Sequence, residues 1–130
     1  MIRKLLVNEV PEIKKLIDPF VKEGLMLPKS LYSLYTTARD FWVMTDESDP
    51  QEIVGCCALH LSWIDLAEIR TLAVKKEYQG KGVGHALVEA CIREACDLRL
   101  KTLFTLTYVP DFFRKAGFLE VDKSTLPNKI

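Results

Sequence analysis

The chain has 130 residues, of which 48% are hydrophobic and 28% charged, and its 18 Lys and Arg residues balance its 18 Asp and Glu residues. This length and composition predict one domain, residues 1–130, with a real hydrophobic core. A net charge near zero argues against broad electrostatic binding to nucleic acid or to an anionic membrane. No stretch approaches the roughly 20 apolar residues of a membrane helix, and no signal-peptide core is visible.

The cysteines and histidines favour free thiols over a metal site. The four cysteines are Cys56, Cys57, Cys91 and Cys96. They form no C-x-x-C pair, and only His60 and His85 could help them to ligate zinc. We therefore expect neither a metal nor a disulfide framework, and a protein of the reducing cytoplasm. His60 is expected to be a hydrogen-bonded structural histidine in a strand.

The N-terminal third of the chain predicts a strand, two helices and a second strand. The expected elements are a strand over residues 2–7, a helix capped by Asn8 with Pro11 in its first turn, a helix capped by Ser30, and a strand over residues 41–45. Gly24 and Pro28 separate the two helices.

The remaining chain predicts a mixed sheet. The expected elements are strands over residues 53–63 and 66–74, a helix over 83–98, a strand over 102–107, a short helix over 111–115 ended by Gly117, and a strand over 118–121. The first two of these strands should form an antiparallel hairpin. The strand, helix and strand that follow indicate a right-handed parallel crossover. The fold class is therefore α/β (α+β), with helices on the faces of the sheet.

A glycine-rich segment, EYQGKGVGHA at residues 77–86, joins a strand to the best helix. Free amides and the positive end of the helix dipole favour an anion there, and glycines let the backbone approach a phosphate closely. A Walker A loop is excluded because Gly82 stands where Ser or Thr is needed, and the dinucleotide fingerprint fails at His85. A turn without a ligand remains the alternative.

The pattern Gln79-x-x-Gly82-x-Gly84 resembles the pyrophosphate loop of the GNAT superfamily of N-acetyltransferases, and KAGF at 115–118 matches the end of their fourth helix. The segments LPKSLYSLY at 27–35, AEIRTLAV at 67–74 and LTYVPDFFRKAGF at 106–118 look like the short stand-alone N-acetylglutamate synthases. The resemblance implies a GNAT fold, with a mixed, mostly antiparallel sheet of six to seven strands and about four helices. It also implies acetyl transfer from acetyl-CoA to glutamate in arginine biosynthesis, without a metal.

The resemblance also implies a coenzyme site. Backbone groups of residues 72–74 would bind the pantetheine arm, and the N–H of Val74 would stabilise the oxyanion. Phe112 and Phe113 would wall the arm, and the glycine loop would hold the pyrophosphate. The implied cofactor-binding residues are Leu72, Ala73, Val74, Gln79, Gly80, Lys81, Gly82, Val83, Gly84, His85, Phe112 and Phe113.

Glu68 is the expected general base, acting through a water on the acceptor ammonium. Arg70 would bind an acceptor carboxylate, because a guanidinium fork matches carboxylate geometry. A second carboxylate calls for another cation, for which Lys29 and Arg39 are candidates. A simple ion pair between Glu68 and Arg70 is the structural alternative. Strict strand alternation would place both on one face together with Leu66, Leu72 and Val74.

The general acid departs from the family pattern. Many members carry a tyrosine four residues before the glycine of the final G-F pair, and this chain has Phe113 there. Tyr108 is therefore the expected hydroxyl for the departing thiolate, with a packing tyrosine as the alternative.

Other functions remain open from the sequence. The acceptor could be another small amine or a protein N-terminus, or the chain could be a non-catalytic acyl-CoA-binding module. Residues 126–130 are too short for a complete seventh strand, so the last strand is expected to be incomplete or supplied by a partner. An exposed sheet edge makes a homodimer plausible.

Overall fold

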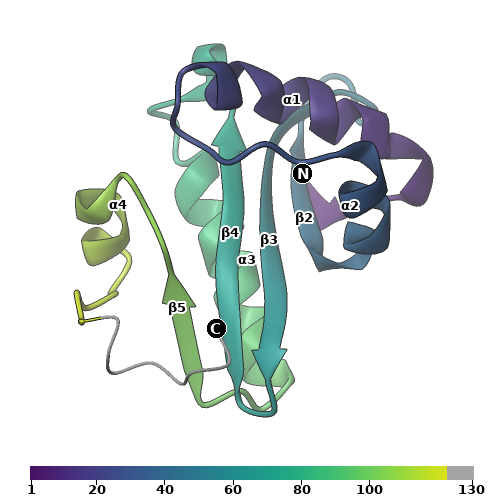
Figure 1. Ribbon diagram of the computed structural model, residues 1–130. Coiled ribbons are helices and arrows are strands. Elements are labelled where there is room, and N and C mark those ends of the chain that lie inside the picture. The colour runs from purple at the N-terminus through teal and green to yellow at the C-terminus, as the bar shows by residue number, and fades with distance from the viewer. Residues whose placement is uncertain (123–130) are drawn as a thin grey trace.

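The computed structural model describes residues 1–122, which form five strands and four α-helices (Figure 1). The strands are β1 (Ile2–Lys4), β2 (Phe41–Thr45), β3 (Ile53–Trp63), β4 (Leu66–Val74) and β5 (Thr102–Thr105). The helices are α1 (Val10–Lys22), α2 (Leu31–Thr36), α3 (Val83–Asp97) and α4 (Pro110–Lys115). Within this part of the chain, no helix has the length and apolar character needed to cross a membrane.

The strands lie in the order β1-β2-β3-β4-β5 in one mixed sheet. The pairs from β1 to β4 are antiparallel, and β4 pairs with β5 in parallel. The β3–β4 hairpin and the parallel crossover through α3 are therefore confirmed. So is the mixed α/β fold class, although residues 1–122 contain five strands where six to seven were expected.

The strand predicted over residues 118–121 is wrong. The N–H of Phe118 donates to the carbonyl of Phe113 at 2.9 Å, and the rings of these residues meet edge to face. The chain therefore folds back on α4 after Gly117 instead of pairing along the sheet, and Leu119 is 87% exposed. The expected incomplete strand at residues 126–130 lies outside the described residues.

Helices cover both faces of the sheet, and each face has its own hydrophobic core. Figure 1 shows α1 and α2 in front of the sheet and α3 behind it. Strand β3 alternates between the two cores: Cys56 and Ala58 pack with α1 and α2, whereas Cys57 and Leu59 pack with α3. The alternating side chains of a strand buried on both faces explain the continuous apolar run in its sequence.

A β-bulge in β4 overturns the strict alternation expected there. Ala58 pairs with Arg70 and Cys56 with Ala73, so one residue of β3 opposes two of β4. Thr71 has a φ of 59°, in the left-handed region. A bulge of this kind shifts the side-chain alternation by one residue. Leu72 and Val74 consequently pack toward α3, while Glu68 and Arg70 face α2.

The helix starts show one correct and one wrong prediction. Ser30 caps α2 as expected, because its hydroxyl accepts from the N–H of Ser33 at 3.0 Å. Asn8 does not cap α1: it lies in a 3₁₀ turn (Val7–Glu9), which also ends β1 earlier than expected. The carboxylate of Glu9 accepts from the N–H of Leu6 instead, and this bond stabilises that turn.

Candidate functional site

Strand β5 pairs with only the first part of β4, so the rest of β4 has an open edge on that side. The pairing runs from Leu66 to Ile69, where the hydroxyl of Thr105 donates to the Ile69 carbonyl at 2.8 Å. Strand β5 ends there, two residues before its expected end, whereas β4 continues to Val74. Figure 1 shows the two ribbons separating toward this end. Within the described residues, β4 from Arg70 onward thus has no strand partner on its β5 side.

The backbone of Val74 points to this open edge. The N–H of Lys75 donates to the carbonyl of Val54 in β3 at 2.9 Å. Successive backbone groups of a strand point to opposite sides, so the N–H and C=O of Val74 point away from β3. The side-chain amide of Gln79 donates to the Val74 carbonyl at 3.0 Å, which leaves the N–H of Val74 available to a ligand.

The glycine segment forms the expected strand-to-helix connection beside this edge. Gly80 and Gly82 have φ values of 77° and 83°, which side-chain-bearing residues adopt only with strain. The first hydrogen bond of α3 runs from the N–H of Ala86 to the carbonyl of Gly82 at 3.0 Å. The amides of residues 83–85 therefore have no helical acceptor, and together with the helix dipole they favour an anion.

A hydrogen bond ties this loop to the turn between β2 and β3. The hydroxyl of Tyr78 donates to the carboxylate of Asp46. This bond lowers the pKa of Asp46 to about 2 and raises the pKa of Tyr78 to about 12. The ammonium of Lys81 lies over the Tyr78 ring, 5.5 Å from its centroid. The base of the loop is thus held in place before any ligand binds.

Helix α4 brings an aromatic side chain to the start of α3. The ring of Phe112 stacks on His85, with centroids 4.5 Å apart, and also contacts Gly84. Phe113 is instead buried in the core on the α3 side of the sheet. Of the two phenylalanines expected to wall the coenzyme arm, only Phe112 contacts the glycine segment.

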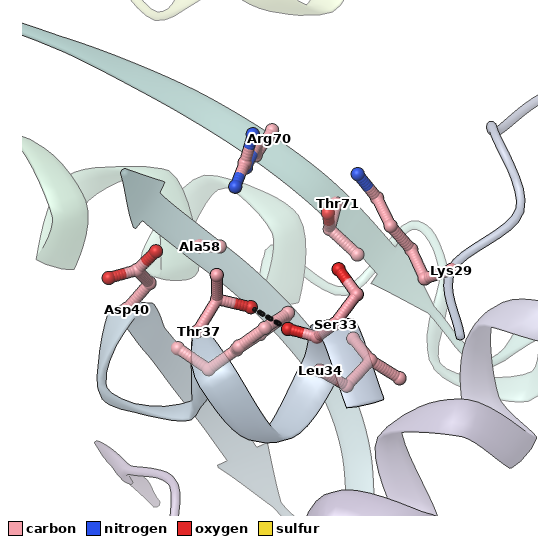
Figure 2. Close-up of a pocket in the computed structure, with 9 residues that line it drawn as sticks. Lys29, Ser33, Leu34, Thr37, Asp40, Ala58, Arg70 and Thr71 are labelled. Carbon is pink, nitrogen blue, oxygen red and sulfur yellow. Dashed lines mark hydrogen bonds between the residues drawn. The ribbon is translucent and has the colours of Figure 1, made fainter. Parts of the chain in front are cut away.

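A small pocket lies on the opposite face of β4, between the sheet and α2. In Figure 2, the side chains of Arg70, Thr71 and Lys29 lie above those of Ser33 and Thr37. The residues that line this recess are Lys29, Ser33, Leu34, Thr37, Asp40, Phe41, Ala58, Arg70 and Thr71. We refer to it as the α2 recess. Its hydroxyls and cations suit a small polar molecule with carboxylates.

Two of the expected acceptor-site residues, Lys29 and Arg70, line the α2 recess, and Glu68 lies beside Arg70. A guanidinium nitrogen of Arg70 lies 3.9 Å from a carboxylate oxygen of Glu68. Burial and the nearby charge of Arg70 lower the pKa of the Lys29 ammonium, while the charge of Glu68 acts in the opposite direction. The site therefore holds a carboxylate and two cations within electrostatic range of one another.

The structure does not bring Arg39 and Tyr108 to this group. Arg39 is exposed in a 3₁₀ turn (Ala38–Asp40) and is absent from the recess lining. Tyr108 is 69% exposed in the connection between β5 and α4.

Sequence reasoning missed several polar residues of the recess. Asp40 lines it, and a carboxylate oxygen of Asp40 lies 2.6 Å from Nδ1 of His60. Ser33, Thr37 and Thr71 add hydroxyl groups. His60 is the hydrogen-bonded strand histidine that the sequence led us to expect, but nothing in the sequence identifies Asp40 as its partner.

Comparison with known proteins adds four findings. A family model described as an acetyltransferase (GNAT) domain matches residues 37–120, which include β4, the glycine segment and α4. An amino-acid acetyltransferase from Mycobacterium tuberculosis is 39% identical over 130 residues, covering 100% of this chain and 74% of that protein. A Mycobacterium tuberculosis protein solved in complex with CoA superposes with a TM-score of 0.92 at 37% identity, over 99% of this chain and 77% of that one. An N-acetylglutamate synthase from Neisseria gonorrhoeae, complexed with coenzyme A and N-acetyl-glutamate, has a TM-score of 0.90 at 28% identity, and this chain covers 30% of it.

Proposed function

Because the chain belongs to the GNAT acetyltransferase family and is an acetyl-CoA-dependent N-acetyltransferase, we propose that its acceptor is the amine of an amino acid, with glutamate preferred. The observation that carries this proposal is that Arg70 and Lys29 line the α2 recess with Glu68 beside Arg70. The names of the amino-acid acetyltransferase and N-acetylglutamate synthase relatives support it. The product would enter arginine biosynthesis.

The open edge of β4 and the glycine segment would hold the acetyl donor. The backbone of residues 72–74 would bind the pantetheine arm, and the N–H of Val74 would stabilise the oxyanion on the thioester carbonyl. The amides of the Gln79–Gly84 loop and the start of α3 would hold the pyrophosphate, with Lys81 and His85 as further donors. Phe112 would lie along the arm beside Gly84.

Glu68 would prepare the acceptor for attack. An amine attacks a thioester only as the neutral base, so its ammonium must first lose a proton. The Glu68 carboxylate lies on the recess face of β4 and is 16% exposed, which suits a base that works through one bound water. Tyr108 is our candidate for protonating the departing thiolate.

Arg70 and Lys29 would select the acceptor by charge. Arg70 would bind one carboxylate of glutamate in a two-pronged contact, and Lys29 the other. Ser33 and Thr71 also line the recess, and their hydroxyls would complete these contacts. Arg39, which the structure leaves outside the recess, is a weaker candidate for the second cation.

An acceptor panel tests the proposal. The purified protein is mixed with acetyl-CoA and each amino acid, and thiol release is followed. We expect the highest kcat/KM with glutamate, and at least a hundredfold loss of kcat in Glu68→Gln, the usual scale for a removed general base, with coenzyme affinity retained. A higher kcat/KM with amines that carry no carboxylate would overturn the amino-acid assignment, and an unchanged rate in Glu68→Gln would remove Glu68 as the base.

A further inference from the structure

Asp40 and His60 form a pair that the mechanism above does not use. A carboxylate oxygen of Asp40 lies 2.6 Å from Nδ1 of His60. Asp40 ends the 3₁₀ turn (Ala38–Asp40) before β2, and His60 lies in β3. The side chains are 23% and 35% exposed, respectively, so the pair is partly buried but reaches solvent.

The Asp40 contact assigns the histidine tautomer. An ionised carboxylate can only accept a hydrogen bond, so the proton at this contact belongs to Nδ1 of His60. The other ring nitrogen, Nε2, is then free to accept a proton, and the Asp40 charge stabilises the imidazolium that results. The same arrangement orients histidines that act as proton carriers in other sites.

His60 faces the proposed base across the β3–β4 ladder. His60 and Glu68 are directly paired, as are Ala58 and Arg70. Directly paired residues project from the same face, with Cβ atoms about 4.5–5.5 Å apart. Ala58, Arg70 and Asp40 all line the α2 recess, which confirms that this face is the recess face. His60 therefore lies next to Glu68, directly across from it on β3.

The reaction needs an exit for one proton. The acceptor enters as an ammonium and leaves as an amide, and the thiolate leaves as a thiol. An ammonium and a thioester thus give an amide, a thiol and one proton for the solvent. Glu68 accepts that proton, but its side chain is only 16% exposed, whereas that of His60 is 35% exposed.

We propose that His60, oriented by Asp40, carries the proton from Glu68 to solvent. The ammonium N–H bond breaks as an O–H bond forms on Glu68, directly or through one water. The proton then passes through water to Nε2 of His60, and the imidazolium releases it to water or buffer. His60 touches neither substrate, so it is a positioning and proton-transfer residue. The inference rests on the proposed role of Glu68.

The variant His60→Asn separates proton transfer from structure. The asparagine amide can donate from nearly the position of Nδ1 and so keep the bond to Asp40, but it cannot carry a proton. In weak buffer we expect kcat to fall about tenfold or more, with KM for both substrates little changed. Added imidazole should restore the rate of the variant and leave the wild-type rate unchanged.

A second variant of His60 and a variant of the proposed base, Glu68, complete the test. If His60→Asn does not fold, His60→Gln is measured in the same way. Full activity in weak buffer, or a loss that imidazole does not restore at an unchanged melting temperature, would overturn the proposal for His60. An unaffected rate in Glu68→Gln would instead remove the base on which it rests. A slow Glu68→Gln beside a fully active His60→Asn would leave the proposed function standing and remove only the relay.

Discussion

The ring of Phe112 packs directly on Gly84, with ring carbons 3.2 and 3.3 Å from the position that a Cβ on residue 84 would occupy. A methyl group at residue 84 would therefore require the Phe112 ring to shift by a few tenths of an ångström. The glycine at this position consequently has a packing role in addition to any contact with a phosphate.

This contact predicts energetic coupling between the two residues. Gly84→Ala favours the helix by up to about 1 kcal/mol, but in the wild-type background the new methyl group must displace Phe112. We expect little net change in the free energy of unfolding. In a Phe112→Leu background the same substitution should stabilise the protein, giving a coupling of at least about 0.5 kcal/mol. Urea denaturation of the four proteins measures it, and additive effects would contradict the packing argument.

The hydrogen bond between Tyr78 and Asp46 predicts a pH-dependent stability. The lowered pKa of Asp46 means that its contribution is present above about pH 4 and is lost as the pH falls toward 2. The raised pKa of Tyr78 means that its contribution is present below about pH 10 and is lost as the pH rises toward 12. The melting temperature of Tyr78→Phe should therefore lie below that of the wild type by a constant amount between about pH 5 and 9, and the difference should shrink outside this range. A difference that does not depend on pH would count against the bond.

The same bond should affect the coenzyme more than the acceptor. Tyr78→Phe frees the base of the glycine loop, so KM for acetyl-CoA should rise about threefold to tenfold, while kcat and the acceptor KM stay near their wild-type values. Steady-state kinetics with each substrate varied in turn separates these constants. Tyr35→Phe, an exposed tyrosine of α2, is a matched control that should leave the KM for acetyl-CoA unchanged. An unchanged coenzyme KM in Tyr78→Phe would show that the loop holds its shape without this bond.

The left-handed conformation of Thr71 predicts an unusual order of substitutions. A β-branched residue at a φ of 59° is strained, whereas asparagine tolerates this region. Thr71→Asn should therefore be more stable than Thr71→Val by about 1 kcal/mol. Elsewhere in a strand the order is the reverse, since valine is the better strand former. Thermal unfolding of both variants, with the same pair made at Thr102 in β5 as a control, decides whether the bulge is present in solution.

The buried cysteines should resist alkylation in the native protein. Cys56, Cys57 and Cys91 are buried, and only Cys96 is exposed. Burial raises the pKa of Cys56 to about 12, and the contact with Cys91 and burial raise that of Cys57 well above its usual range. Iodoacetamide at neutral pH should therefore modify Cys96 alone, and all four cysteines in urea. Mass spectrometry after short exposure counts the adducts, and early modification of Cys56 would contradict the packing of β3.

Local patterns predicted most of the elements. The hairpin of β3 and β4, the crossover through α3 and the Ser30 cap all follow from alternation, helical periodicity and the hydrogen-bonding capacity of a serine. The cap at Asn8 failed because residues 7–9 form a 3₁₀ turn that leads directly into α1, so Asn8 lies inside that turn and not at the helix start. The strand at residues 118–121 failed because Phe118 packs on Phe113, which a local pattern does not reveal.

The candidate site was also predicted correctly where it depends on neighbouring residues and wrongly where it depends on strand pairing. The glycine segment was identified from sequence because positive φ values and free amides at a helix start are properties of a few consecutive residues. Glu68 and Arg70 were correctly placed on one face, since they lie two residues apart before the bulge. Leu72 and Val74 were wrongly expected on that face. The bulge at Thr71 shifts the side-chain alternation of β4, so both pack toward α3.

The sequence alone determined the family, the order of the elements up to α4 and the glycine-rich strand-to-helix connection, since each depends on residues close together in the chain. Tertiary structure decided which side chains come together at the α2 recess and beside it. Asp40, His60 and Glu68 come from three elements, and they meet through the register of β3 against β4 and the packing of the turn before β2. Register depends on pairing between distant segments, and a single inserted residue reverses the face that every later side chain occupies.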